Sequence, residues 1–389
     1  MDPRRIYFDN AATTPLDPRV LEPMAAAFAQ VFGNPSSLHA DGRQAREAVD
    51  LARERVAALL GAKPAEICFT SGGTESNNLA IRGVVGSFST GGCHLITTAI
   101  EHPSVLEVCR GFSPELVQVT RLPVGEDGIL DPDDLHRAIT PETRLISIMA
   151  ANNVVGTLQP IADCGRIAHE HRIAFHVDAT QAVGKVPLDV NRQRIDLLSF
   201  SAHKIYGPKG VGGLFIREGT PLVSFIGGGG QERGRRSGTE NVPGIVALGA
   251  AAELCRQEMA EESARIVRLR ERLADRLLDA VPEAYLIGHR YRRLPGLASF
   301  GFDGLEGQAI RLMLALDEAG VSVSTGSACS SNHAAGPSHV LTAMGFDPLR
   351  ARGSLRVSLG RFSTEEEVDL FVDLLAGLVR DLSPMVSRN

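Results

Sequence analysis

Residues 196–216 read DLLSFSAHKIYGPKGVGGLFI and contain two short apolar runs joined by a polar, glycine-containing turn. The first run, 196–200, has the length and composition of a buried β-strand. The second, 210–216, follows too closely for a crossover helix to connect two parallel strands. The segment therefore predicts a buried strand with an antiparallel neighbour.

Four more short apolar runs lie upstream of this segment and predict further buried strands. They are EICFT at 66–70, HLITT at 94–98, RLISIMA at 144–150 and IAFHV at 173–177. Helical or loop segments separate them, among them predicted helices at 43–61 and 75–84. This alternation indicates βαβ units and an α/β fold with a mostly parallel central sheet.

The pattern changes near residue 255. A long, charged amphipathic helix is predicted over about 253–280, and the chain ends in another helix. Ser363 and Glu366 have the spacing of a capping box for that last helix. We therefore expect a large α/β domain at 15–255 and a smaller α+β domain formed by 1–14 with 256–389.

Composition excludes several classes of protein. The 389 residues are 43% hydrophobic and 22% charged, with a net charge of −6, so a folded protein without a nucleic-acid-binding basic surface is expected. No run reaches the ~18 apolar residues of a membrane span, and the opening MDPRRIYFDN lacks the apolar core of a signal peptide. Six scattered cysteines without C-x-x-C spacing predict neither disulfides nor a zinc site, so a reduced, cytoplasmic protein is expected.

Polar residues follow the predicted strands at the points where those strands end. Taken singly, each is most simply a turn or capping residue, but parallel strands place all of them at one edge of the sheet. They are Ser71-Gly72-Gly73-Thr74, Glu101-His102, Asn152-Asn153, Asp178 with Gln181, and Ser201 with His203 and Lys204.

This set suits pyridoxal phosphate. The glycine turn opening a helix at Gly73 can cradle a phosphate, and Asp178 can keep the pyridine nitrogen protonated. A lysine must form a Schiff base with the cofactor aldehyde. The chain has four lysines, and only Lys204 directly follows a strand in line with Asp178, whereas Lys63, Lys185 and Lys209 lie in turns or beside glycine.

The chain as a whole resembles the group I (NifS/IscS-like) cysteine desulfurases, a branch of the class V aminotransferase superfamily with the type I fold of pyridoxal phosphate enzymes. The resemblance runs from residue 7 to the last helix. It is carried by YFDNAATTPLDPRV, FGNPSSLHADGRQAREAV, FTSGGTESNNLAI, EHPSVL, FHVDATQAVGKVPLD, SFSAHKIYGPKGVGGL, GGGQERGRRSGTENVP, VSTGSACSS, PSHVLTAMG and SLRVSLGRFSTEEEVD.

The resemblance implies a role for each matching position. Lys204 would bind the cofactor, Asp178 would pair with the ring nitrogen and Gln181 with the ring hydroxyl. His102 would stack on the ring and move protons. The phosphate would be held by Gly73, Thr74, Ser201 and His203, with Asn153 touching the cofactor and Thr239 reaching the phosphate in the partner subunit of a homodimer. Arg356, helped by Asn34, would clamp the substrate carboxylate.

Cys329, in the small-residue run STGSACSSNHAAGPS of the small domain, is the predicted nucleophile. Its sulfur would take sulfur from L-cysteine as a persulfide, release L-alanine, and pass the sulfur to a protein acceptor such as an iron–sulfur scaffold or a thiolation protein. No resident metal is expected, although Cys329 could transiently ligate an iron–sulfur cluster. The other five cysteines are expected to be buried and inert.

Two positions depart from the family pattern: Val154 stands where Glu is usual, and Gly336 where an acidic residue is common. Other functions are less consistent with these residues or share the same site. Selenocysteine lyase activity would use the same site, whereas a transaminase or a kynureninase-type enzyme needs no thiol. A dinucleotide-binding protein could use the glycines at 227–230 and Gly234, but this run has no clear strand before it and no helix start at the required spacing after it. A catalytically silent sulfur-relay protein would not need Lys204, Asp178 and Cys329 together.

Overall fold

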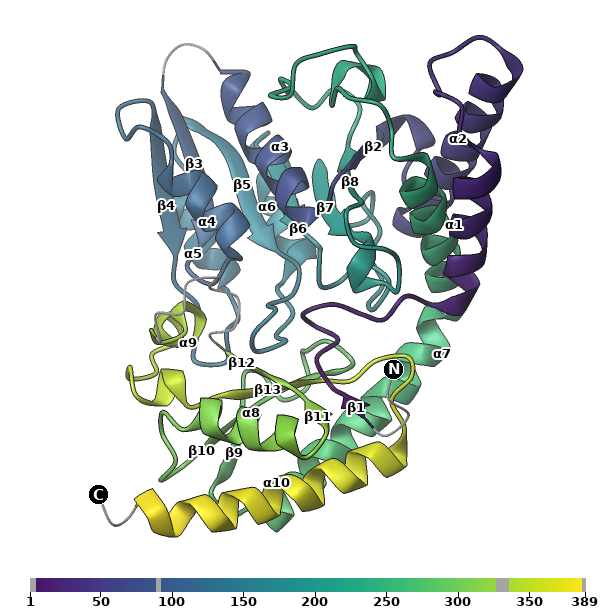
Figure 1. The fold of residues 1–389 in the computed structure, drawn as a ribbon. Helices are drawn as coiled ribbons and strands as arrows, with labels where there is room; N and C mark the ends of the chain where they lie inside the picture. Colours follow the sequence, from purple (N-terminus) through teal and green to yellow (C-terminus); the bar gives the residue numbers. More distant parts are fainter. Residues whose placement is uncertain (1–4, 89–91, 327–335, 387–389) are drawn as a thin grey trace.

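The computed structural model describes residues 5–88, 92–326 and 336–386 (Figure 1). A central sheet of seven strands has the order β2-β8-β7-β6-β5-β3-β4. Its strands are β2 (Ile67–Thr70), β3 (Cys93–Thr98), β4 (Val117–Leu122), β5 (Thr143–Met149), β6 (Ala174–Asp178), β7 (Leu197–Ser201) and β8 (Gly212–Ile216). All neighbours pair in parallel except β8, which is antiparallel to both β7 and β2.

This sheet confirms the predicted α/β class and the antiparallel neighbour of the 196–200 strand. The predicted strands lie within two residues of the observed ones. One strand of this sheet, β4, was not predicted from the sequence. It lies at the edge of the sheet and exposes Gln118 and Arg121, so it is less apolar than its buried neighbours.

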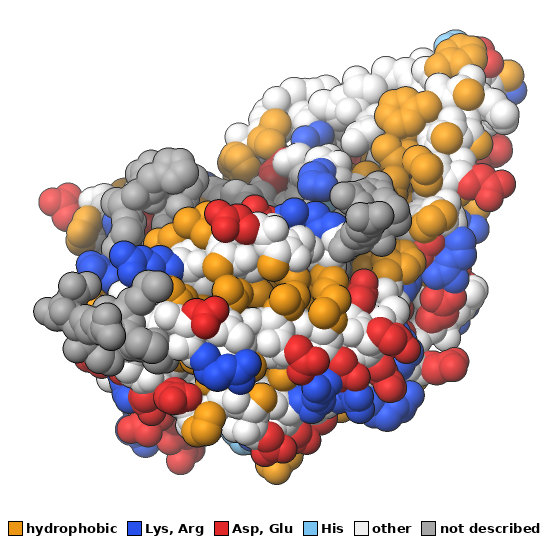
Figure 2. Space-filling view, turned by 60° about the horizontal axis from the view of Figure 1, so that its bottom comes forward, with side chains coloured by type: hydrophobic (Ala, Val, Ile, Leu, Met, Phe, Trp, Pro, Cys, Tyr) orange, Lys and Arg blue, Asp and Glu red, His pale blue; other side chains and the backbone are white. Residues whose placement is uncertain are grey.

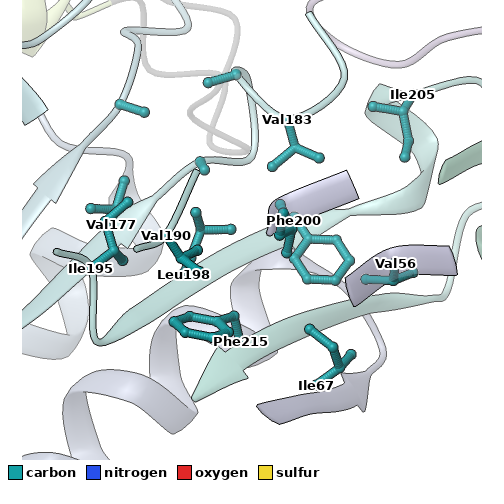
Figure 3. Packing of buried hydrophobic residues seen from close by; sticks show 14 of the residues in the cluster. Val56, Ile67, Val177, Val183, Val190, Ile195, Leu198, Phe200, Ile205 and Phe215 are labelled. Carbon is teal, nitrogen blue, oxygen red and sulfur yellow. The ribbon is translucent and has the colours of Figure 1, made fainter. Parts of the chain in front are cut away.

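Helices cover both faces of the central sheet. One face packs against α3 (Gly73–Gly86) and α4 (Pro103–Arg110). The other packs against α2 (Ala40–Leu60), α5 (Pro132–Ala138), α6 (Ile161–Glu170) and the first part of α7 (Val242–Ala280). Successive side chains of β7 point to opposite faces of the sheet. Leu197 packs on the face covered by α3 and α4, whereas Leu198 and Phe200 pack on the opposite face. Figure 3 shows Phe200 beside Val56 of α2.

A second body of structure lies below the central sheet in Figure 1. It holds an antiparallel sheet of order β12-β13-β10-β9, from β9 (Ala284–Ile287), β10 (Leu297–Phe302), β12 (Ser324–Thr325) and β13 (Leu355–Ser358). The strand β1 (Ile6–Tyr7) pairs with β11 (Val321–Ser322). Helices α8 (Ala309–Glu318), α9 (His339–Ala343) and α10 (Glu365–Val386) complete it, while α1 (Pro18–Gln30) packs on α7. Apolar residues of β1, α8 and α10 share a separate core with the second half of α7.

Two sequence expectations in this half are corrected. Helix α7 begins at Val242 and not near 253, because its first turns are small or apolar residues buried on most sides, which hides the amphipathic pattern. It therefore runs unbroken through the boundary expected at residue 255 (Figure 1). The capping box of α10 is Thr364 with Glu367, and Ser363 instead accepts the backbone N–H of Gly360.

Ion pairs tie α7 to α10 on the face that Figure 2 presents, where acidic and basic side chains are interspersed. Arg272 and Arg276 of α7 both contact Asp369 of α10. Such exposed pairs add little stability each, so the apolar core beneath them supplies most of it. In the described parts of the chain, no helix is long and apolar enough to cross a membrane.

Asp17 joins the two bodies of structure at a buried point. Its carboxylate caps α1 by accepting the Arg19 backbone N–H at 2.9 Å, and accepts Arg361 Nη1 from the segment before α10 at 2.6 Å. The Arg361 guanidinium also lies 4.4 Å from the centre of the Tyr206 ring. Burial raises the Asp17 pKa, but the opposing bonds from Arg19 and Arg361 prevail and hold it well below its ordinary value of 3.8.

Asp17→Asn is expected to destabilise the protein by about 3 kcal/mol at pH 7, because it removes the charge that pairs with Arg361, whose side chain is only 9% exposed. The stabilisation by Asp17 is full above pH ~3.8 and is lost as the pH falls further, because the folded-state pKa is lowered. Urea unfolding of wild type and variant at pH 7 and pH 3 measures both effects. The exposed Asp41→Asn in α2 is the control and should change stability by less than about 0.5 kcal/mol; an equal loss in both variants would contradict the prediction.

Candidate active site

A pocket of about 310 Å³ lies at the carboxyl ends of the central strands. Of the thirteen predicted site residues, nine line it: Gly73, Thr74, His102, Asn153, Asp178, Gln181, Ser201, His203 and Lys204. A tenth, Arg356, is buried directly beside the pocket and donates from Nη1 to the Asn153 carbonyl at 2.9 Å. Further lining comes from Ala11, Ala12, Asn77, Ser104, Met149, Ala151 and Thr180.

One end of the pocket has the features of a phosphate site. Helix α3 begins here after Gly72, which offers no side-chain cap, so the positive end of the helix faces the pocket. A Cβ on Gly73 would lie 2.7 Å from Thr180 Oγ1, so only glycine fits this close approach. Thr180 Oγ1 is buried and has no hydrogen-bond partner among the described residues. A cradle of this kind, with hydroxyls of Thr74 and Ser201, fits a phosphate group.

Asp178 is held in a fixed orientation at the end of β6. Its Oδ1 accepts the Thr180 backbone N–H at 3.0 Å, and its Oδ2 accepts Asn77 Nδ2 at 2.8 Å. Asn77 was missed by the sequence reasoning, because it lies one turn inside α3 and not directly after a strand. A buried carboxylate fixed by two donors fits the role of partner to a protonated ring nitrogen.

Lys204 ends the short 3-10 helix Ala202–Lys204 that follows β7. Its Nζ donates to the carbonyl of Ala11 at 2.6 Å and to that of Ala12 at 2.7 Å. Gln181 Nε2 donates to the same Ala11 carbonyl at 2.8 Å. The N-terminal arm therefore forms one wall of the pocket, which no side-chain pattern could have indicated.

Lys185 lies nearer to the pocket than the sequence suggested. Its Nζ donates to Gln181 Oε1 at 3.3 Å, which fixes the direction of the Gln181 amide. Burial, with a smaller contribution from the charge of the nearby Lys204, lowers the pKa of Lys185 to about 7. Lys204 remains the lysine that lines the pocket.

Two histidines border the pocket, and burial lowers the pKa of both. The His203 pKa falls to about 4, helped by the charges of Lys204, Lys209 and Lys185. His203 Nδ1 lies 3.1 Å from Thr13 Oγ1. His102 caps α4 and its pKa is lowered by burial, with Asp178 opposing the shift and Lys204 adding to it. Both rings are therefore mainly neutral at pH 7.

Besides Arg356, three predicted site residues are not among those that line the pocket. Asn34 is exposed and its Oδ1 accepts the Ser36 backbone N–H at 2.9 Å, so the predicted help to Arg356 is not seen within one chain. Thr239 is exposed on the segment before α7. Cys329 lies outside the described residues. The five other cysteines are buried, as expected, and burial raises the pKa of Cys68, Cys109, Cys164 and Cys255 to about 12.

Val154, at the position of the family's usual Glu, is buried in an apolar cluster with Val340 and Leu341 of α9. A Cβ on Gly326 would lie 3.3 Å from its Cγ1. The valine therefore packs beneath both chain segments that flank residues 327–335. Within the described chain, no cluster of three His, Cys, Asp or Glu residues could hold a metal ion.

Glu101 is a fully buried carboxyl group beside the site. Its Oε1 accepts Thr98 Oγ1 at 2.7 Å and the Met149 N–H at 2.9 Å, whereas Oε2 has no partner in the described structure. Burial raises its pKa from 4.5 to about 8, and the nearby Asp178 adds to the shift. Glu101 is therefore largely neutral at pH 7.

Glu101→Gln is expected to raise the melting temperature at high pH. The raised folded-state pKa means that the wild type loses stability as the pH rises from 4.5 to about 8, and the glutamine variant does not. The difference should be near zero at pH 4.5 and about 5–10 °C at pH 8. Thermal melts across this range test it, with exposed Glu107→Gln on α4 as control; parallel curves for wild type and Glu101→Gln would contradict it.

Comparison with known proteins identifies the family to which the chain belongs. The model of the aminotransferase class-V family matches residues 6–371. A protein named cysteine desulfurase IscS from Dictyoglomus turgidum is 48% identical over 379 residues, covering 97% of this chain and 95% of the relative. The human protein named cysteine desulfurase is 48% identical, covering 98% of this chain and 84% of the relative.

Solved structures agree in fold and sequence. A NifS-like protein superposes with a TM-score of 0.90 at 41% identity, covering 97% of this chain and all of that one. A structure described as SspA in complex with cysteine has a TM-score of 0.81 at 37% identity, covering 92% of this chain and 100% of the other. These matches span both bodies of structure and the residues that line the pocket.

Proposed function

The chain belongs to the class V aminotransferase family, among its IscS- and NifS-like cysteine desulfurases, and from that premise we propose how its residues act on L-cysteine. It is an enzyme that depends on pyridoxal phosphate and has the type I fold of such enzymes. The observation that carries the proposal is one pocket that holds Lys204, Asp178 and a glycine-opened helix together.

Bound pyridoxal phosphate supplies an electron sink that labilises the α-hydrogen of an attached amino acid. Gly73, Thr74, Ser201 and His203 would hold its phosphate. Its ring would lie between His102 and the residues that follow β6, with Asp178 at the ring nitrogen, Gln181 at the ring hydroxyl and Asn153 also in contact. Lys204 Nζ would hold the cofactor at rest and, once displaced by substrate, take the α-proton and later return it.

Arg356 is proposed to bind the substrate carboxylate. It is 1% exposed, its Nη2 donates to Asp9 Oδ1 at 2.9 Å, and its buried Nε has no partner in the described structure. Asp9 therefore holds the guanidinium in place beside the pocket until a second carboxylate arrives. A planar guanidinium can serve both acceptors at once, which an ammonium group does less well.

Arg356→Lys is expected to lower kcat/KM for L-cysteine about 100-fold, mainly through a higher KM, because the forked contact to the carboxylate is lost. Steady-state alanine release measures it. Arg350→Lys, an exposed arginine paired with Asp303, is the control and should behave as wild type. An unchanged KM in Arg356→Lys would refute the assignment.

The sulfur-transfer step is assigned to Cys329. Its thiolate attacks the sulfur of L-cysteine, an S–S bond forms and the C–S bond breaks. The electron pair of the broken bond stays with the carbon side, which is protonated and leaves as L-alanine. The persulfide sulfur on Cys329 then passes to a protein acceptor, for which we propose an iron–sulfur scaffold or a thiolation protein in the cytoplasm.

A homodimer is proposed because Thr239 is exposed and the segment that carries it is firmly anchored. In that segment, Glu232 accepts two bonds from buried Arg53 at 2.8 Å and one from the Phe69 backbone. Arg236 pairs with Glu75 of α3 at 2.7 Å, close to the phosphate end of the pocket. An anchored, exposed hydroxyl can serve the phosphate site of a partner subunit.

The direct test is release of L-alanine and sulfide from L-cysteine by the holoenzyme with a thiol reductant. Equal amounts of the two products support the proposal, and a cofactor-loaded protein that releases neither would overturn it. L-Selenocysteine in the same assay separates the alternative activity: a kcat/KM that favours L-selenocysteine by several orders of magnitude would indicate a selenocysteine lyase.

A further inference from the structure

We propose that Asn77 and Ser104 hold His102 as its neutral Nε2–H tautomer, so that the proton which the ring can offer to the pocket is on Nε2. That the Nε2–H donates to L-cysteine rests on the proposed function. The assignment of the tautomer rests only on a chain of hydrogen bonds. That chain runs from Asp178 through Asn77 and Ser104 to the imidazole.

The direction of each bond follows from its neighbour, starting at Asp178. A carboxylate oxygen accepts, so the group 2.8 Å from Asp178 Oδ2 must be the Asn77 amide nitrogen; the flipped amide would bring two oxygens together. The second hydrogen of the same nitrogen is directed to Ser104 Oγ, also at 2.8 Å. Asn77 therefore acts as a double donor.

The hydrogen bond from Asn77 fixes the direction in which the Ser104 hydroxyl donates its own hydrogen. Its Oγ accepts from Asn77, which leaves its own hydrogen for His102 Nδ1 at 2.8 Å. The Ser104 backbone N–H also donates to Nδ1, at 3.1 Å. Because Nδ1 accepts from two donors, the single proton of the neutral ring must be on Nε2.

The charges that face the ring are Asp178, Lys204 and His339. Asp178 favours the protonated ring, whereas burial, Lys204 and His339 favour the neutral one and prevail, so the His102 pKa is lowered. Protonation at Nδ1 would also place N–H groups of His102 and Ser104 face to face. The Nε2–H is therefore available to an anionic atom of the ligand, such as the carboxylate or thiolate of L-cysteine.

Nitrogen-15 NMR of the histidine-labelled holoenzyme tests the tautomer, with the His102 signal identified by its absence in His102→Gln. Between pH 6 and pH 9 we expect a protonated Nε2 and an unprotonated Nδ1. Ser104→Ala should raise the His102 pKa by about one unit, and Ser104→Thr, which keeps the hydroxyl, should restore it. A protonated Nδ1 in the wild type would overturn the proposal, whether or not Ser104→Ala folds.

Ser147→Ala is the matched control. Ser147 Oγ lies 2.8 Å from His176 Nδ1 in the sheet core, outside the pocket, so its loss should leave the His102 pKa unchanged. A shift of His102 in this variant equal to that in Ser104→Ala would overturn the proposal. Protonated Nε2 in an enzyme that makes no sulfide would refute the proposed function alone, and protonated Nδ1 in an active desulfurase would refute this inference alone.

Discussion

Lys204→Ala is expected to lower alanine release from L-cysteine by about 10³-fold or more, because it removes both the cofactor attachment and the base that moves the α-proton. Lys204 lines the pocket, and its Nζ donates hydrogen bonds to the Ala11 and Ala12 carbonyls within 2.7 Å, which hold the amine in place. The assay is the same release of alanine and sulfide.

Borohydride reduction of the holoenzyme followed by peptide mapping gives a readout independent of turnover. Reduction should fix the cofactor on the peptide that contains Lys204. Lys209→Ala, which removes an exposed lysine five residues further on, is the control and should keep wild-type activity. The lowered pKa of Lys185 also makes it a good amine nucleophile at neutral pH. Cofactor found on the peptide that contains Lys185 would therefore reassign the attachment site.

The parts of the fold that could be predicted are those with a local pattern. The strands β6 and β7 are buried on both sides, so each appears in the sequence as a short, mainly apolar segment with a polar end. The edge strand β4 and the apolar start of α7 lack such patterns, because their burial is decided by partners far away in the sequence.

The same reasoning explains the site. Asp178 and Lys204 directly follow strands, and a parallel sheet brings strand ends together, so their meeting was predictable. The Ala11 and Ala12 carbonyls carry no side-chain signal, and Asn77 is hidden one turn inside a helix. The sequence places Lys185 beside a glycine, which suggests an exposed turn. In the fold its Nζ instead contacts Gln181, because a residue in a turn is not necessarily exposed.

Cys329→Ala is expected to abolish sulfide release from L-cysteine, by about 10³-fold or more, since no other group is proposed to accept the sulfur. The thiolate is the nucleophile, and burial raises the pKa of four other cysteines to about 12, which keeps them protonated at neutral pH. The pKa of the fifth, Cys93, is also raised by burial. Burial therefore argues against each of these five cysteines as the nucleophile, and the proposal rests the step on Cys329.

Mass spectrometry of the enzyme after L-cysteine, without reductant, locates the transferred sulfur. One additional sulfur atom should appear on the peptide containing Cys329 and on no other. Cys109→Ala is the control, since it removes a buried thiol from the α4 core and should leave the persulfide and the activity intact. Full activity in Cys329→Ala would refute the assignment, because another thiol, such as the reductant in the assay, would then have to take the sulfur from L-cysteine while the electron pair of the C–S bond stays on carbon.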